Sequence, residues 1–171
     1  MASEVTFRRV RLLQAAVSEI LGVCVSRLTL NEDRRGSLVE AYRTDELQTL
    51  FIGQPQMAYI SATLGGVVRG PHVHKYQTDM FVFLGPEAFE LYLWKESAPG
   101  IIGKAERMVV RPCWRAVIPP GVIHAYKNIG TELSLVFNLP DRLYKGINKQ
   151  HPVDEIRYED DPDSPFQVPT D

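Results

Sequence analysis

The hydrophobic residues from position 37 onward recur in short runs, and several of these runs alternate apolar with polar positions. The runs are rich in β-branched and aromatic side chains, as is typical of strands. Pairs such as Gly70-Pro71, Gly85-Pro86 and Pro99-Gly100 punctuate them. Many short strands divided by turns predict an all-β sandwich or barrel of the jelly-roll kind. The expected strands are 38–42, 56–63, 78–84, 89–94, 107–110, 115–118, 124–128 and 133–139.

The two ends of the chain carry weaker patterns. Residues 8–21 place Val10, Leu13 and Val17 at helical spacing, whereas residues 23–25 are typical of a strand, so helix and strand both remain open there. The whole chain, 1–171, fits a single domain, with 1–30 as an N-terminal edge segment and minor helical or irregular terminal parts. Residues 154–171 are acidic and contain proline. We expect them to pack near or over the barrel mouth, with a solvated tail as the alternative.

Composition narrows the class of protein. The chain has 171 residues and a net charge of −2, which disfavours nucleic acid or an anionic membrane as a partner. No run approaches the ~18 apolar residues that a membrane span needs. Arginines interrupt the N-terminal apolar stretch, which argues against a secretory signal. The two cysteines, Cys24 and Cys113, form no metal or redox motif. We expect reduced thiols and a cytoplasmic location.

Three of the four histidines lie in two short motifs that also include an aspartate. His72 and His74 are two apart, so they share one face if they lie on a strand. Asp79 opens the next apolar run, and His124 follows the Pro-Pro-Gly turn at 119–121. Inward residues of a barrel converge on one interior. The sequence therefore predicts a pocket holding three imidazoles and a carboxylate.

These two motifs, at 66–85 and 119–128, resemble the two motifs of the cupin superfamily. The second matches in full, and the first carries Asp79 where glutamate is usual. The resemblance implies a cupin, that is, a double-stranded β-helix jelly-roll barrel. Either motif alone would be a weak signal.

More of the chain resembles one cupin branch, the dTDP-4-dehydrorhamnose 3,5-epimerase family. The matching segments come in the family's order from about residue 30 to the end: 33–40, 61–72, 120–126, Tyr144 and 160–162. The resemblance implies cofactor-free epimerisation of a nucleotide-linked 4-keto-6-deoxy sugar in carbohydrate biosynthesis. Family members pair through their sheets, so a homodimer is also expected.

The same resemblance implies residue roles. His72 matches the base that removes a proton beside the C4 ketone, and Asp161 is expected to orient it and to stabilise the imidazolium. His74 and Tyr126 are candidates for the acid that returns the proton. The substrate-binding positions are Arg35, Glu40, Arg69, Ser61, His124 and Tyr144.

Four positions depart from the family pattern. The family's acid tyrosine aligns with Phe137, which cannot carry a proton. A family lysine that could stabilise the enolate aligns with Asp79, and two family glutamines align with His74 and Met57. These substitutions therefore weaken the assignment of the reaction more than the assignment of a keto sugar as substrate.

Three alternatives stay open beside the 3,5-epimerase. A His-x-His pair without the tyrosine also resembles the sugar 3,4-ketoisomerases, another cupin branch. A metal-dependent cupin would bind a divalent ion through His72, His74, Asp79 and His124, whereas the epimerase reading expects no metal and no cofactor. A cupin that has lost its acid could also bind a sugar nucleotide without catalysis.

Overall fold

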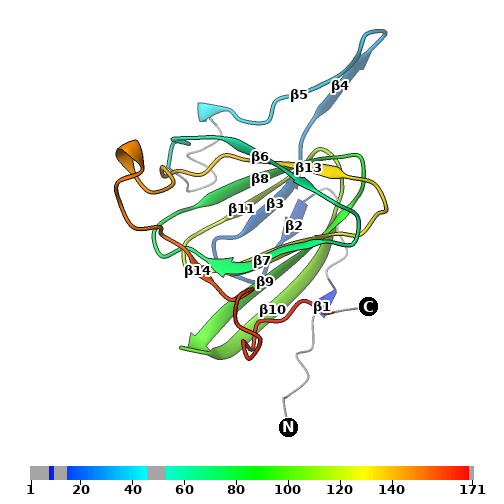
Figure 1. The fold of residues 1–171 in the computed structure, drawn as a ribbon. Coiled ribbons are helices and arrows are strands. Elements are labelled where there is room, and N and C mark those ends of the chain that lie inside the picture. Colours follow the sequence, from blue (N-terminus) through cyan, green and yellow to red (C-terminus); the bar gives the residue numbers. More distant parts are fainter. Residues whose placement is uncertain (1–7, 10–14, 46–52, 170–171) are drawn as a thin grey trace.

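The computed structural model describes residues 8–9, 15–45 and 53–169, and nearly all of its regular structure is β (Figure 1). One short 3-10 helix, η1 (Ile147–Lys149), lies in the segment after β13. The strands are β1 (Arg8–Arg9), β2 (Ala15–Val17), β3 (Cys24–Arg27), β4 (Leu30–Asp33), β5 (Gly36–Val39), β6 (Tyr59–Thr63), β7 (Val68–Val73), β8 (Asp79–Gly85), β9 (Phe89–Ala98), β10 (Ile101–Val110), β11 (Trp114–Ile118), β12 (Ile123–Asn128), β13 (Ser134–Asn138) and β14 (Ile156–Arg157).

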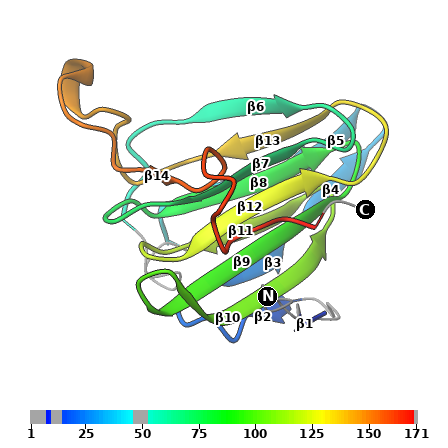
Figure 2. The ribbon, with the colours of Figure 1, turned by 60° about the horizontal axis from the view of Figure 1, so that its bottom comes forward.

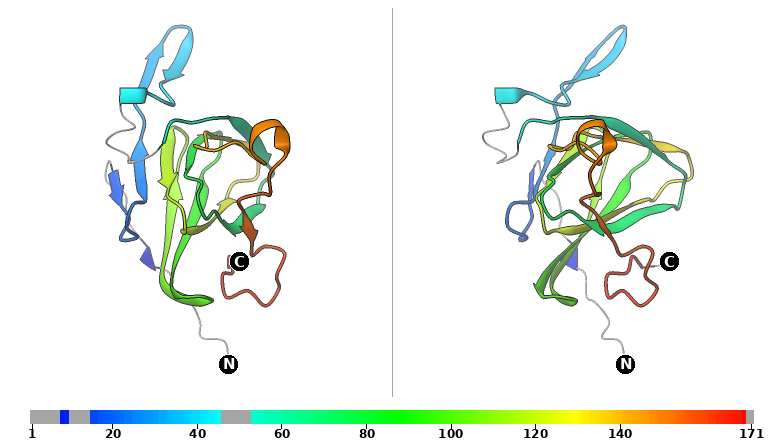
Figure 3. Two further views of the ribbon diagram at one scale, coloured as in Figure 1. Left: turned by 90° about the vertical axis from the view of Figure 1, so that its left-hand side faces the viewer. Right: turned by 60° about the vertical axis from the view of Figure 1, so that its left-hand side comes forward.

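Two six-stranded sheets face each other as a jelly roll. The first has the order β1-β10-β9-β12-β7-β14, and the second has the order β2-β3-β11-β8-β13-β6. The strand pairs are antiparallel except for β1 with β10. The β4–β5 hairpin forms a separate two-stranded sheet that projects from the barrel, as Figures 1 and 3 show.

Alternation along the strands gives the barrel a filled interior and two apolar outer faces. Phe81, Phe83 and Val136 point inward with residues of β9, β10 and β11 and form the largest buried cluster. Met80 and Val82 point out of the second sheet, into a separate cluster. On the outer face of the first sheet, Phe166 packs against β9 and β12, and Figure 2 shows the C-terminal segment crossing there.

The eight predicted strands correspond to β5, β6 and β8 to β13, with ends that differ by a few residues. The helix that remained open for residues 8–21 is wrong where the structure describes that stretch, because residues 8–9 and 15–17 pair as edge strands. Residues 154–157 do lie at the barrel mouth, but Phe166 and its neighbours cover an outer face. The described part of the chain holds no helix long and apolar enough for a membrane span.

Candidate active site

One end of the barrel opens into a cavity of about 970 Å³, between the barrel interior and the segment 140–157. A smaller cavity of about 330 Å³ continues into the interior. Tyr59, His72, Glu155 and Arg157 line both. These four side chains therefore lie where the two cavities meet.

Strands β7, β8 and β12 bring the predicted cluster together. His72 on β7 pairs directly with His124 on β12, and Asp79 begins β8 in the facing sheet. Gly70 allows this close pairing. It has φ +85°, and a Cβ there would lie 2.6 Å from the carbonyl oxygen of His124. Any side chain at position 70 would push β7 away from β12.

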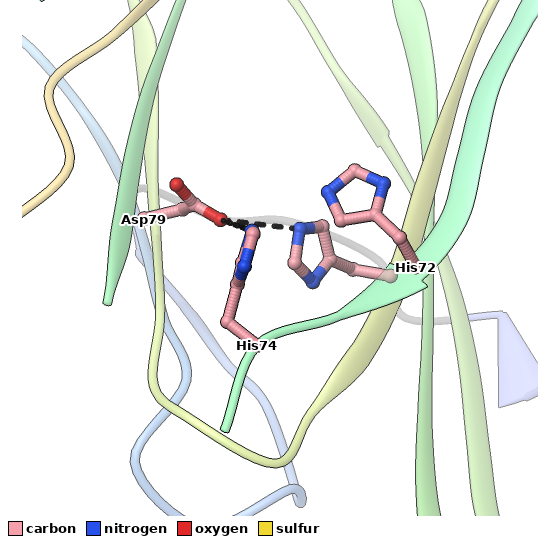
Figure 4. Close-up of side chains that lie close together, drawn as sticks. His72, His74 and Asp79 are labelled. Atoms are coloured by element: carbon pink, nitrogen blue, oxygen red, sulfur yellow. Dashed lines mark ion pairs between the residues drawn. The ribbon is translucent and has the colours of Figure 1, made fainter. Parts of the chain in front are cut away.

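The four side chains form one compact group, of which Figure 4 shows His72, His74 and Asp79. One ligand atom from each of His72, His74, Asp79 and His124 lies within 4.8 Å of the others. Asp79 Oδ2 is 3.1 Å from His74 Nε2 and 3.4 Å from His124 Nε2. The His72 and His124 ring centroids are 4.4 Å apart. This geometry confirms that the three imidazoles and the carboxylate converge, and of the four residues His72 and His74 line the cavities.

Backbone carbonyls orient two of the imidazoles. His124 Nδ1 lies 3.0 Å from the oxygen of Val122, and His74 Nδ1 contacts the oxygen of Asp154. A carbonyl only accepts, so both Nδ1 atoms carry a proton and both Nε2 atoms turn toward Asp79. In their neutral forms these Nε2 atoms are acceptors that face a carboxylate. Asp79 Oδ2 and His124 Nε2 are buried without a conventional hydrogen bond. A proton or a cation must bridge such a group of acceptors.

The pKa of Asp79 and the pKa of His74 shift in opposite directions, and each shift favours the charged form of its residue. Burial alone would raise the pKa of Asp79, but the ring nitrogens of His124 and His74 beside the carboxylate outweigh burial and hold that pKa far below its ordinary value. Gln77 and Asn138 also donate to its Oδ1, at 2.9 and 2.8 Å. Burial opposes a charge on His74, yet the Asp79 carboxylate 3.1 Å from its Nε2 raises the pKa of His74 to about 8.

His72 is the neutral member of the group. Burial, followed by the charges of His124 and His74 beside it, lowers the pKa of His72 to about 2. Its Nδ1 lies 3.9 Å from Oε1 of Glu155. Strand β14 pairs with β7, with Arg157 opposite His72, and this pairing carries Glu155 over the ring.

The structure does not bring Asp161 to His72. Asp161 is exposed, and its Oδ1 accepts a bond from the backbone N–H of Asp163 at 3.0 Å. The expectation that Asp161 orients His72 fails because the chain pairs with β7 through β14, which places Glu155, six positions before Asp161, beside His72. Glu155 was missed, and no local pattern marks it, because strand return is a tertiary feature.

The other predicted site residues divide between the pocket and the surface. Tyr126 lies inside the barrel with its hydroxyl 2.7 Å from Ser61 Oγ, and Arg69 donates to Thr63 Oγ1 at 3.0 Å. Both Tyr126 and Arg69 line the smaller cavity, and Tyr144 lines the larger one. Arg35 and Glu40 line neither.

Arg35 and Glu40 have partners near the projecting hairpin. Arg35 forms an ion pair with Asp33 at 2.6 Å, and Glu40 pairs with Arg43 at 3.1 Å. Within one chain, the expectation that these two residues contact the substrate is therefore not met.

Two aromatic residues, Phe137 and Tyr59, bear on which side chain could donate a proton in place of the family's tyrosine. Phe137 packs against the cluster on the outer face of the second sheet, so it does not occupy a position facing His72. Its neighbour Asn138 points inward to Asp79. Tyr59, which the sequence did not single out, lines both cavities and accepts a hydrogen bond from Asn138 Nδ2 at 2.8 Å.

No family model matches the chain. A curated relative, a probable low-salt glycan biosynthesis epimerase of Haloferax volcanii, is 36% identical over 129 residues, which span 70% of this chain and 78% of the relative.

Several solved structures share the fold at low identity. A 4-keto-6-deoxy sugar epimerase from the novobiocin gene cluster of Streptomyces spheroides superposes with a TM-score of 0.71 at 19% identity, covering 98% of this chain and 84% of the other. For a dTDP-4-dehydrorhamnose 3,5-epimerase of Sulfolobus tokodaii the TM-score is 0.65 at 20% identity, with coverage of 92% and 88%. A 3,4-ketoisomerase of Helicobacter canadensis gives 0.60 at 18%, with coverage of 81% and 92%.

Proposed function

Since this chain belongs to the cupin family of the dTDP-4-dehydrorhamnose 3,5-epimerases, as a divergent member, we propose that it is an isomerase of a dTDP-linked 4-keto-6-deoxy sugar. The observation that carries the proposal is His72. It is a neutral imidazole at the junction of two cavities, with the Glu155 carboxylate 3.9 Å from its Nδ1.

The chemistry needs a neutral base beside a ketone. The C4 carbonyl of such a sugar acidifies the hydrogens on C3 and C5, because their removal gives an enolate. His72 takes one of these protons with its free ring nitrogen. Glu155 then stabilises the imidazolium, as a carboxylate does beside a catalytic histidine. The pair does here what the sequence assigned to His72 and Asp161.

The larger cavity suits a nucleotide diphosphate at its rim. Arg142, Lys145, Lys149 and Arg157 are among its lining residues. Guanidinium and ammonium groups bind phosphate oxygens strongly, and arginine can do so with two parallel bonds. The sugar then extends toward His72, and Arg69 and Ser61 line the cavity beyond it.

A homodimer belongs to the proposal. Arg35 and Glu40 match substrate-binding positions of the family, yet they lie on and beside a hairpin that stands away from the barrel (Figure 3). In a dimer, Arg35 and Glu40 of one copy could contact the substrate bound in the cavity of the other copy. Analytical sedimentation of the purified protein measures its oligomeric state. A monomeric protein would mean that neither Arg35 nor Glu40 contacts the substrate.

Turnover tests the proposed function directly. The chelator-treated protein is mixed with dTDP-4-keto-6-deoxyglucose, and proton NMR follows the sugar signals. New signals of a C3 or C5 epimer, or of a 3-keto isomer, are expected with the native protein and absent with His72→Ala. An unchanged spectrum, with and without added divalent metal, would rule out this substrate.

A second candidate is a metal-dependent activity. It is favoured by the two buried atoms without a hydrogen bond, Asp79 Oδ2 and His124 Nε2, at the centre of four ligand groups. Three imidazoles and a carboxylate fit Fe, Mn, Ni or Zn, and the carbonyl bonds at both Nδ1 atoms already orient the Nε2 lone pairs. A bound ion would supply Lewis-acid polarisation of the ketone. His72 would then be a ligand and not the base.

Metal content and metal titration separate the two candidates. Elemental analysis of the purified protein and calorimetric titration with Zn²⁺ and Mn²⁺ measure binding. Stoichiometric binding that Asp79→Asn abolishes, together with loss of turnover in chelator, would favour the metal-dependent activity.

A further inference from the structure

Epimerisation needs a second group that the proposed function does not yet name. His72 removes a proton from one face of the sugar, and inversion requires that a proton returns on the opposite face. The donor must therefore lie across the cavity from His72. The residue expected there from the family, at position 137, is a phenylalanine on the outer face of the second sheet.

Tyr59 lies on the sheet that faces His72. His72 is on β7 of the first sheet, whereas Tyr59 begins β6, at the edge of the second sheet (Figure 1). Both side chains line both cavities. A sugar that fills the space between the two sheets would thus present one face to each residue.

Hydrogen bonds fix the Tyr59 hydroxyl at this position. Asn138 sits opposite Tyr59 in the β6–β13 register, and its Nδ2 donates to the hydroxyl at 2.8 Å. The same Nδ2 donates to Asp79 Oδ1 at 2.8 Å. In the part of the chain that the structure describes, the hydroxyl accepts this bond and donates none. Its own hydrogen is therefore available to a bound molecule.

Tyr126 and Tyr144, the two tyrosines that the sequence singled out, are placed less well. Tyr126 is 4% exposed, its ring packs edge-on against Phe81 and Phe89, and its hydroxyl is already bonded to Ser61. Tyr144 lies on the segment that closes the outer end of the larger cavity and does not line the inner one. Tyr59 is 44% exposed, so it reaches both the sugar and bulk water.

We propose that Tyr59 is the catalytic acid opposite His72. After His72 has taken the proton and the electron pair of the C–H bond has moved into the enolate, the enolate carbon takes the hydrogen of the Tyr59 hydroxyl. The ketone re-forms and the configuration is inverted. The phenolate left behind accepts the bond from Asn138, and water returns its proton, while His72 loses its proton to water. Burial, and next the charge of Asp79, raise the pKa of Tyr59, so the phenol is fully protonated before the reaction.

The test separates proton removal from inversion, and it rests on the proposed function. Native protein, Tyr59→Phe and Tyr126→Phe are each incubated with dTDP-4-keto-6-deoxyglucose in deuterated water, and NMR follows deuterium in the unchanged sugar and in the epimer. With Tyr59→Phe, His72 still exchanges the proton and returns deuterium to the same face. We expect deuterated starting sugar at near the native rate and at least ~100-fold less epimer. Tyr158→Phe, on the outer face beside Phe166, is the matched control and keeps both rates.

Each other outcome overturns the proposal in a recognisable way. Epimer formation by Tyr59→Phe at the native rate would show that Tyr59 is not the acid, while the proposed function would stand. Loss of inversion with retained exchange in Tyr126→Phe instead would move the acid to Tyr126. A native protein that makes a 3-keto isomer needs no opposite donor, and one that exchanges no proton ends both proposals.

Discussion

Asp79 Oδ2 lies 3.4 Å from His124 Nε2, and both atoms are buried without a conventional hydrogen-bond partner. Asp79 is 1% exposed and His124 is 2% exposed, so bulk water does not reach either residue. These two acceptors face each other with no hydrogen between them, and we call this arrangement the electrostatic gap of the four-residue cluster. A proton on His74 would give Asp79 Oδ2 a donor, whereas a divalent ion would satisfy both atoms, and the two cases differ in measurable ways.

Asp79→Asn should fill the gap with an amide hydrogen. The new Nδ2 would donate to an imidazole Nε2, while its Oδ1 would still accept from Gln77 and Asn138. We expect the free energy of unfolding of the chelator-treated variant to stay within about 1 kcal/mol of the native value, because one satisfied network replaces another. The NMR titration of His74 should shift to lower pH, since the carboxylate that raises its pKa is gone. A loss of several kcal/mol would show that the charged carboxylate itself stabilises the fold.

The stability of the metal-free protein should be highest near pH 6.5 and should fall on either side. The folded pKa of His74, about 8, exceeds the unfolded value near 6.5, so its contribution is complete below pH 6.5 and is lost as the pH rises through 8. This contribution is on the order of 2 kcal/mol. The pKa of His72, about 2, lies below its unfolded value, so its contribution is complete above pH 6.5 and falls at lower pH. Urea unfolding from pH 5 to pH 9 measures the free energy of unfolding on both sides of this maximum. A free energy that does not change between pH 6.5 and pH 9 would contradict the raised pKa of His74.

Glu155→Gln should slow proton abstraction by roughly 10- to 100-fold, because the amide cannot neutralise the imidazolium of His72. The affinity for substrate should change little. Rates of deuterium incorporation, with kcat and KM determined separately, provide the measurement. Asp161→Asn is the comparison, since Asp161 is exposed in a turn. A larger loss from Asp161→Asn than from Glu155→Gln would restore the role that the sequence assigned to Asp161.

Gly70→Ala should damage the site more than Gly66→Ala. Both glycines have positive φ, +85° and +75°, so alanine strains either backbone by about 1 kcal/mol. A Cβ at position 66 meets nothing within 4 Å, whereas one at position 70 meets the carbonyl of His124 at 2.6 Å. We expect Gly70→Ala to lose at least about 2 kcal/mol more in thermal unfolding and to displace His124. Equal losses from the two variants would mean that β7 and β12 separate easily.

Eight strands and the four-residue cluster could be predicted because both depend on local pattern, although β7, which carries His72, was not among the expected strands. A period of two places His72 and His74 together, and the second cupin motif adds His124. The resemblance aligned the family's acid tyrosine with Phe137, but an alignment to a motif does not say which face of a strand is inward. The register of β13 with β6 and β8 decides this, and it turns Asn138 inward and Phe137 outward.

Glu155 and Tyr59 lay beyond sequence reasoning for a different reason. Glu155 reaches His72 only because β14 returns to pair with β7. Tyr59 gains its role from a neighbour, Asn138, that is 79 residues away in the chain. Contacts of such sequence separation follow from the closed barrel and not from any local motif.

The most direct test of the central claim is deuterium incorporation at C3 and C5 of dTDP-4-keto-6-deoxyglucose by the chelator-treated protein in deuterated water. We expect incorporation at one or both carbons by the native protein and none by His72→Ala, with both proteins folded by circular dichroism. Incorporation that persists in His72→Ala, or that the native protein shows only after a divalent metal is added, would contradict His72 as the base.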